Sequence, residues 1–332
     1  VAISLAMLGF ASSGVYLILR PVPPEDRTAR IPRVAFQFAI SALVLLFYSC
    51  AAPFLLEFLK SVIGKGASRV IVVTTLFGLS VVPFFLAGLF LSWALVTHAK
   101  EWAGRVYGSN LVGSAAGCWI VIILLKFLGC AGAIVTTAIA GFCATLLVDT
   151  EGMQRKKALV GILACSLLLI PAIVRQGDDF IFLRTLIKLT FPTDRHELRR
   201  WDSSSCVDFV QMPPDPFGFW GADKRNFTGA WPRKIGVYID SYAFTSIINA
   251  EDLKKDSTFF DRLPISVPLS VKENKAPHVL VIGAGGGNDV RAALHFGAGK
   301  VTAVEINPLI VEEVRDKYKD YSGDLYNHPK VN

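Results

Sequence analysis

The stretch "HVLVIGAGGGNDVRAALHFGAGKVTAVEIN", residues 278–307, decides the fold of the C-terminal part of the chain. Its apolar runs, its glycines and Pro308 just beyond it divide it into short elements. The pattern predicts a strand at 278–282, a glycine turn at 283–289, a helix at 288–297, a strand at 300–306 and a helix at 308–321. This order is typical of a doubly wound α/β domain.

The glycine turn predicts a ligand site. Glycines let the main chain turn sharply and approach a ligand closely, and a helix start offers unpaired N–H groups. Glu305 ends the second strand, where a carboxylate can accept hydrogen bonds from both hydroxyls of a ribose. We therefore expect bare main-chain amides at 283–287 and the Glu305 carboxylate to hold a nucleoside at the carboxyl ends of the strands.

The spacing of the glycines narrows the class of nucleoside. The dinucleotide fingerprint needs glycine at its first, third and sixth positions, which here are Gly283, Gly285 and Asn288. The third glycine is missing. Gly287 instead completes G-x-G-x-G, the spacing usual in S-adenosylmethionine-type domains. A nucleoside thioether is thus the expected ligand, with NAD or a degenerate, empty fold as alternatives.

The rest of the chain is typical of a membrane protein. Of its 332 residues, 52% are hydrophobic and 18% charged, and the charge is concentrated after residue 174. A helix needs about 20 apolar residues to cross a bilayer. Six stretches approach that length: 1–19, 34–59, 70–97, 110–128, 130–148 and 158–174. We expect about six helices, because unpaired main-chain groups are too costly in lipid.

Three domains follow from this division. Residues 1–174 are predicted to form the transmembrane domain. Residues 175–275 are predicted to form a linker unit, with an interfacial helix at 180–191 and a β-hairpin whose strands are 206–211 and 234–240. Residues 276–332 are predicted to form the N-terminal part of a Rossmann-like nucleoside-binding domain, and we expect the chain to be a fragment at both ends.

The net charge of +7 does not indicate nucleic acid. No basic run is interleaved with aromatic residues as in single-strand binders. Lysines and arginines beside membrane spans meet anionic headgroups instead, so the lipid bilayer is the expected partner. Basic residues flank the spans in similar numbers on both sides of the membrane, so they do not decide the orientation of the chain in it. The six cysteines have no ligand-like spacing, so no metal site is expected.

The C-terminal motifs resemble a known family. "APHVLVIGAGGGNDVRAAL" followed by "KVTAVEINP" is similar to the core of spermidine synthases, the polyamine aminopropyltransferases. "VYIDSYAFTSI" and "FFDRLPISVPL" resemble that family's N-terminal hairpin and the segment entering its core. A multi-span region, a short β unit and this core, in that order, resemble bacterial membrane-integrated spermidine synthase-like proteins, whose core is also similar to class I S-adenosylmethionine-dependent transferases.

The resemblance implies transfer of an aminopropyl group from decarboxylated S-adenosylmethionine to a small amine such as putrescine. S-adenosylmethionine itself is the alternative co-substrate. The ligand-binding residues expected by position are Gly283, Gly285, Gly286, Gly287, Asp289, Glu305 and Asn307. The family's aspartate within the turn is replaced by Gly286, and Asp289 is expected to cap the following helix. The family's acidic catalytic motif would lie beyond Asn332, so no catalytic residue is assigned.

Because this co-substrate is a cytosolic metabolite, we expect an integral protein of the bacterial inner (plasma) membrane with its C-terminal domain in the cytoplasm. A homo-oligomer is left open. Three alternatives to aminopropyl transfer remain. They are an S-adenosylmethionine-dependent methyltransferase, a nucleotide-gated channel or transporter, and a non-catalytic membrane scaffold that carries a Rossmann domain.

Overall fold

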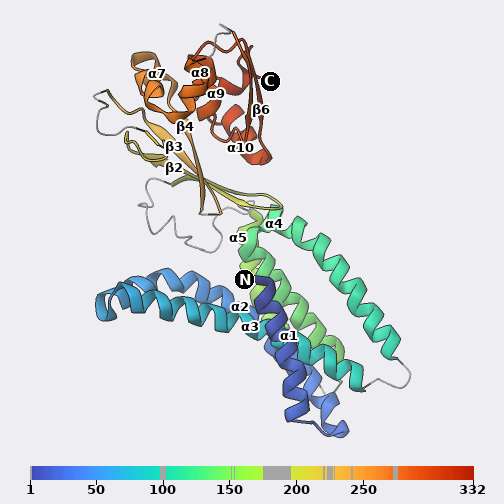
Figure 1. The fold of residues 1–332 in the computed structure, drawn as a ribbon. Coiled ribbons are helices and arrows are strands. Elements are labelled where there is room, and N and C mark those ends of the chain that lie inside the picture. The colour runs from blue at the N-terminus through green and yellow to red at the C-terminus, as the bar shows by residue number, and fades with distance from the viewer. Residues whose placement is uncertain are drawn as a thin grey trace. The chain divides into compact units, whose positions relative to one another are not determined.

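The fold falls into two compact units, Val1–Arg184 and Thr185–Asn332 (Figure 1). The structure is a computed structural model that describes residues 2–97, 102–150, 152, 154–174, 196–219, 221–222, 227, 229–240, 242–271 and 276–332. The predicted interfacial helix at 180–191 lies outside the described residues. The predicted division into three domains therefore stays a prediction.

The first unit is helical. Its helices are α1 (Ala2–Leu19), α2 (Pro24–Ile63), α3 (Lys65–Thr97), α4 (Ala103–Val148) and α5 (Arg155–Val174). Three segments are long and apolar enough to cross a membrane: Thr28–Ile63, Lys65–Thr97 and Ala103–Val148. A shorter apolar helix covers Ile3–Leu19. These lengths and compositions are compatible with integration in a membrane.

The expected spans 110–128 and 130–148 both belong to α4, which the structure runs through without a connecting loop. Between them Gly129 has φ 65° and ψ −178°, a conformation outside the helical region that glycine adopts at little cost. The helix turns back at this residue, as the green segment in Figure 1 shows. Its second half packs on α2, where Phe142, Val135 and Leu46 form a buried cluster.

The second unit begins with a four-stranded antiparallel sheet in the order β1-β2-β3-β4. The strands are β1 (His196–Trp201), β2 (Cys206–Met212), β3 (Lys234–Ile239) and β4 (Ala243–Ile248). Strands expected at 206–211 and 234–240 are present as β2 and β3. The expected two-stranded hairpin is nevertheless too small, because β1 and β4 flank it on either side.

The sequence of β1, "HELRRW", does not predict a strand, because its charged residues do not alternate with apolar ones. In the sheet these charges find buried partners. Arg199 Nε donates to Asp208 Oδ1 on β2 at 2.6 Å, and Tyr318 donates to Glu197 at 2.8 Å. Tertiary pairing thus compensates the cost of burying charge, which the strand's own sequence does not reveal.

A parallel βαβ unit follows the sheet. Strand β5 (His278–Ile282) leads through the glycine turn to α9 (Asn288–His295), then to β6 (Lys300–Val304) and α10 (Pro308–Arg315). Strands β5 and β6 pair in parallel, as expected from the sequence. The helix predicted over 308–321 is shorter than expected: it ends at Arg315, and turns continue the chain.

Short helices join the two sheets: α7 (Ala250–Lys255), η2 (Thr258–Arg262), η3 (Pro264–Ser266) and α8 (Val267–Ser270). The antiparallel sheet packs directly on α10, where Val207, Val237 and Ile247 meet Ile310 and Val314 in one buried cluster. This packing places the last strand, β4, beside the glycine turn.

Candidate functional site

The conformation of the glycine turn explains its composition. Gly283, Gly285 and Gly287 have φ of 77°, 54° and 91°, the left-handed region that other residues adopt at a cost. Gly286 is required for a different reason. A side chain at this position would collide with the main chain of Ser246 on β4, so its hydrogen allows the turn and the strand to touch.

The expectation of bare amides at 283–287 is wrong. All five N–H groups donate within the protein: four donate to groups at the end of β6 or on β4, and that of Gly287 donates within the turn. The bonds run from Gly283 and Ala284 to Val304 O (2.8 and 3.0 Å), from Gly285 to Glu305 Oε2 (2.7 Å), from Gly286 to Thr245 Oγ1 (3.0 Å) and from Gly287 to Ala284 O (2.8 Å). Ligand recognition must therefore use other groups.

Glu305 is held firmly at the edge of the turn. One carboxylate oxygen accepts from the Gly285 amide at 2.7 Å and the other accepts from the Asn307 amide at 2.8 Å. A carboxylate has about four acceptor positions, so two remain for a ligand. The side chain is only partly buried, which keeps those positions accessible.

Asn307 is committed to the protein itself. Its side-chain oxygen accepts from Leu309 N at 3.1 Å and caps α10, while its amide nitrogen donates to Ser205 Oγ at 2.9 Å. Its main-chain amide supports Glu305. The structure therefore gives Asn307 the geometry of a positioning residue, and its predicted contact with a ligand stays a prediction.

A cavity of about 340 Å³ opens beside the turn, within the range of small-molecule sites. Its lining residues come from the segment before β3, from β4, from η2–η3 and from the turn and the start of α9: Gly218, Phe219, Phe244, Thr245, Leu263, Ile265, Gly283, Ala284, Asn288 and Asp289. Asp289 is the one charged residue among them. Two phenylalanine rings and one carboxylate line the cavity, a combination that favours a cation.

The expectation that Asp289 caps α9 is wrong. The N-cap residue is Gly287, no side chain caps the helix, and Asp289 lies in its first turn. Its carboxyl group is partly buried, and that burial raises its pKa above 3.8. Neighbouring Asn288 donates to Ser246 Oγ at 3.0 Å, whereas its buried Oδ1 has no hydrogen-bond partner among the described residues. The cavity thus offers acceptors to a ligand that brings N–H donors.

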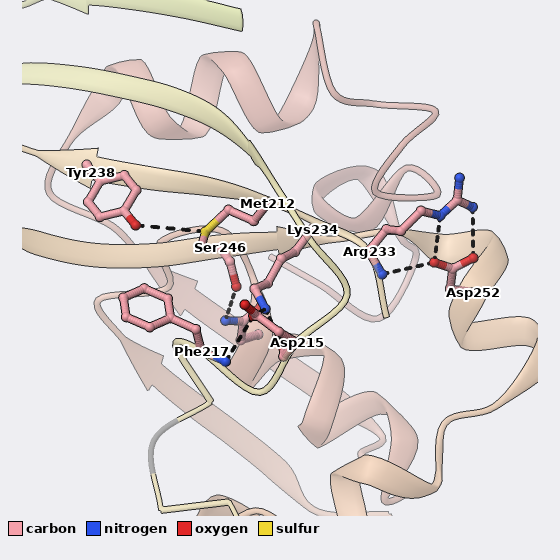
Figure 2. Close-up of polar contacts among 9 residues, drawn as sticks. Met212, Asp215, Phe217, Arg233, Lys234, Tyr238, Ser246 and Asp252 are labelled. Atoms are coloured by element: carbon pink, nitrogen blue, oxygen red, sulfur yellow. Dashed lines mark hydrogen bonds and ion pairs between the residues drawn. The ribbon is translucent and has the colours of Figure 1, made fainter. Parts of the chain in front are cut away.

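An ion pair joins the buried Lys234 to the partly exposed Asp215 (Figure 2). The Lys234 side chain is fully buried, and its Nζ donates to Asp215 Oδ1 at 2.7 Å and to the Asp215 carbonyl at 2.5 Å. The same ammonium lies 5.0 Å from the ring centroid of Phe219, which lines the cavity. Burial lowers the pKa of Lys234, and Asp215 opposes that effect.

Several residues of this site were not identified from the sequence. Thr245 and Phe244 stand in the quoted hairpin "VYIDSYAFTSI", so that motif contained a signal for them. The sequence contained no signal for Lys234, Asp215 or Tyr326. A fully buried lysine is rare, so Lys234 was not expected in the interior. Tyr326 donates to the Gly285 carbonyl at 2.5 Å, and burial raises its pKa. Within the described residues no cluster of three or more His, Cys, Asp or Glu could hold a metal ion.

Comparison with known proteins gives a limited result. No family model and no solved structure matches the chain. Over 104 residues, 30% of the chain, it is 30% identical to a polyamine aminopropyltransferase from Alkaliphilus metalliredigens (strain QYMF). The chain covers 36% of that protein, so it spans about a third of the length of this curated relative.

Proposed function

We propose that the protein is a membrane-anchored transferase with a Rossmann-like core that binds decarboxylated S-adenosylmethionine and passes its aminopropyl group to a small amine such as putrescine. The cavity beside the glycine turn, with Asp289 as its one charged lining residue, carries this proposal. The parallel βαβ unit and the similarity to a polyamine aminopropyltransferase support it.

The adenosine end of the co-substrate is assigned to Glu305. Its two remaining acceptor positions suit the two ribose hydroxyls, and the amides of Gly285 and Asn307 hold the carboxylate still. Gly283 is exposed and has no heavy atom within 4 Å of where a side chain would start. It lets a ligand pass close to the main chain and continue into the cavity, which Gly283 also lines.

The amine end is assigned to the cavity. The Asp289 carboxylate attracts an ammonium group, and Phe219 and Phe244 supply aromatic rings whose faces attract a cation. Such a cavity can align an amine with the reacting carbon, which is worth several kcal/mol in a bimolecular reaction. The ammonium group bound here can be that of the co-substrate's aminopropyl group or that of the acceptor amine.

In the reaction, a neutral amine nitrogen attacks the methylene carbon bonded to the sulfonium. The new C–N bond forms as the C–S bond breaks, sulfur keeps the bonding electron pair, and methylthioadenosine leaves. The attacking nitrogen then gives one proton to a base. We expect that base to be an acidic residue, and the residues described here supply binding and alignment.

We place the protein in the bacterial inner membrane with its second unit in the cytoplasm, where the co-substrate is made. The proposed partners are the lipid bilayer and the small amine, without nucleic acid, and a homo-oligomer remains open. Three helices of sufficient length and apolarity support the membrane part of this proposal.

Calorimetry on the full chain in detergent tests the proposal. We expect binding heat with methylthioadenosine and none with NAD or ATP, and tighter binding when putrescine is also present. Incubation with decarboxylated S-adenosylmethionine and putrescine, followed by mass spectrometry, should then give spermidine. Heat with NAD alone would refute the proposal, and methylated product from S-adenosylmethionine would favour a methyltransferase instead.

A further inference from the structure

A second cavity lies within the helical unit and is independent of the function proposed above. It has a volume of about 870 Å³ and is lined by residues of α1, α2, α3 and both halves of α4. The two halves can face the same space because α4 turns back at Gly129, so that Ser109 before the turn and Thr137 after it line one cavity.

The walls are mainly apolar, with Phe90, Leu91 and Ala140 among them. Arg105 is the one charged lining residue. Its guanidinium lies 4.4 Å from the ring centroid of Trp102, which also lines the cavity, and no carboxylate pairs with it in the described part of the chain. An apolar cavity with one unpaired cation favours an amphipathic anion.

The position of Arg105 indicates which amphipathic anion. Trp102 is the N-cap of α4 and Arg105 lies in its first turn, next to the end of α3 at Thr97. Tryptophan and arginine at a helix end are typical of the membrane–water interface. The apolar walls then extend from that level along the helices, which is the layout of a phospholipid with its headgroup at the interface.

We propose that this cavity binds a membrane phospholipid with an anionic headgroup. The phosphate lies on the Arg105 guanidinium and the acyl chains lie along Phe90, Leu91 and Ala140. Arg105 is exposed, so an anionic headgroup can reach its guanidinium, whereas an amine would be repelled by it. Arginine suits this role because its planar guanidinium can bond two phosphate oxygens at once.

The test uses the full chain in detergent, with native mass spectrometry after addition of phosphatidylglycerol or phosphatidylcholine with identical acyl chains. The wild type should retain phosphatidylglycerol about fivefold better, the effect of one arginine near an anionic lipid. Arg105→Gln should abolish this preference and Arg105→Lys should keep part of it. Arg69→Gln is the matched control, because Arg69 is exposed on α3 and does not line the cavity.

A second variant tests the proposal by filling the cavity while keeping Arg105. Ala140→Leu places a larger side chain into the space and should reduce retention of both lipids, whereas Ala115→Leu on the same helix, away from the cavity, should not. Size-exclusion chromatography of each variant establishes that it is folded. Equal retention of the two lipids by the wild type, or equal loss in Arg105→Gln and Arg69→Gln, would overturn the proposal.

Discussion

The Glu305 carboxylate lies 2.7 Å from the amide nitrogen of Gly285. Two residues that the sequence assigns to a ligand therefore bind each other. A free carboxylate would have to be ordered when a ligand arrives, whereas here the glycine turn and the end of β6 order it beforehand. In the proposed site, the turn would hold the acidic group that accepts from the ligand, and its own amides would not donate to the ligand.

Replacing Glu305 tests this arrangement directly. Glu305→Ala should lower the affinity for methylthioadenosine by about tenfold or more, because a hydrogen bond to a charged group contributes about 1.5–3 kcal/mol. Isothermal titration calorimetry on the full chain measures the change. Glu312→Ala is the control, since Glu312 is exposed on α10. Equal affinities of the two variants would remove Glu305 from the site.

The contact between the turn and β4 predicts a loss of stability. Gly286 is buried and its amide donates to Thr245 Oγ1 at 3.0 Å. Thr245→Val keeps the shape but leaves this amide unsatisfied, so the free energy of unfolding should fall by about 1–3 kcal/mol. Thermal unfolding of the full chain measures it. Thr245→Ser retains the hydroxyl and should lose clearly less; a similar loss in both variants would show that the hydrogen bond is unimportant.

Asp289 should lower the free energy of unfolding, although we propose that it binds the amine. Burial raises its pKa in the folded state, so the folded protein disfavours the ionised form. Asp289→Asn should therefore raise the midpoint of thermal unfolding at neutral pH, and the gain should disappear as the pH falls below 3.8, where the carboxyl is protonated in both states. The same variant should weaken putrescine binding. Unchanged amine affinity would contradict the role given to Asp289.

The Arg233–Asp252 pair predicts acid sensitivity. Arg233 donates to both carboxylate oxygens at 2.8 Å, and these bonds lower the pKa of Asp252 to about 2 (Figure 2). The stabilisation is complete above the unfolded-state pKa, about 3.9, and is lost as the pH falls through about 2. Asp252→Asn should lower the unfolding midpoint at neutral pH and flatten its decline between about pH 4 and pH 2.

The control for this pair is Glu251→Gln on the same helix. Glu251 pairs with Lys254 at 2.6 Å, but both side chains are largely exposed. Solvent screens such a pair, so its removal should change the unfolding midpoint little at any pH. A shift as large as that of Asp252→Asn would mean that helix α7 responds to any change of charge.

The sequence by itself determined the local elements around residues 278–307. Alternating and continuous apolar runs predicted β5 and β6, the glycines predicted the turn, and long apolar runs predicted the long apolar helices, because these features depend on neighbours along the chain. Gly283, Gly285 and Gly287 were identifiable for the same reason. Their positive φ values are a local requirement.

Only the tertiary structure decided what those elements offer a ligand. Four of the five N–H groups of the turn donate to Val304, Glu305 and Thr245, partners that lie 20 or more residues away in the chain. The Lys234 ammonium and the Arg199 guanidinium of β1 can be buried because Asp215 and Asp208, from other segments, pair with them. A sequence records which groups can form hydrogen bonds, and packing determines which of them are left free.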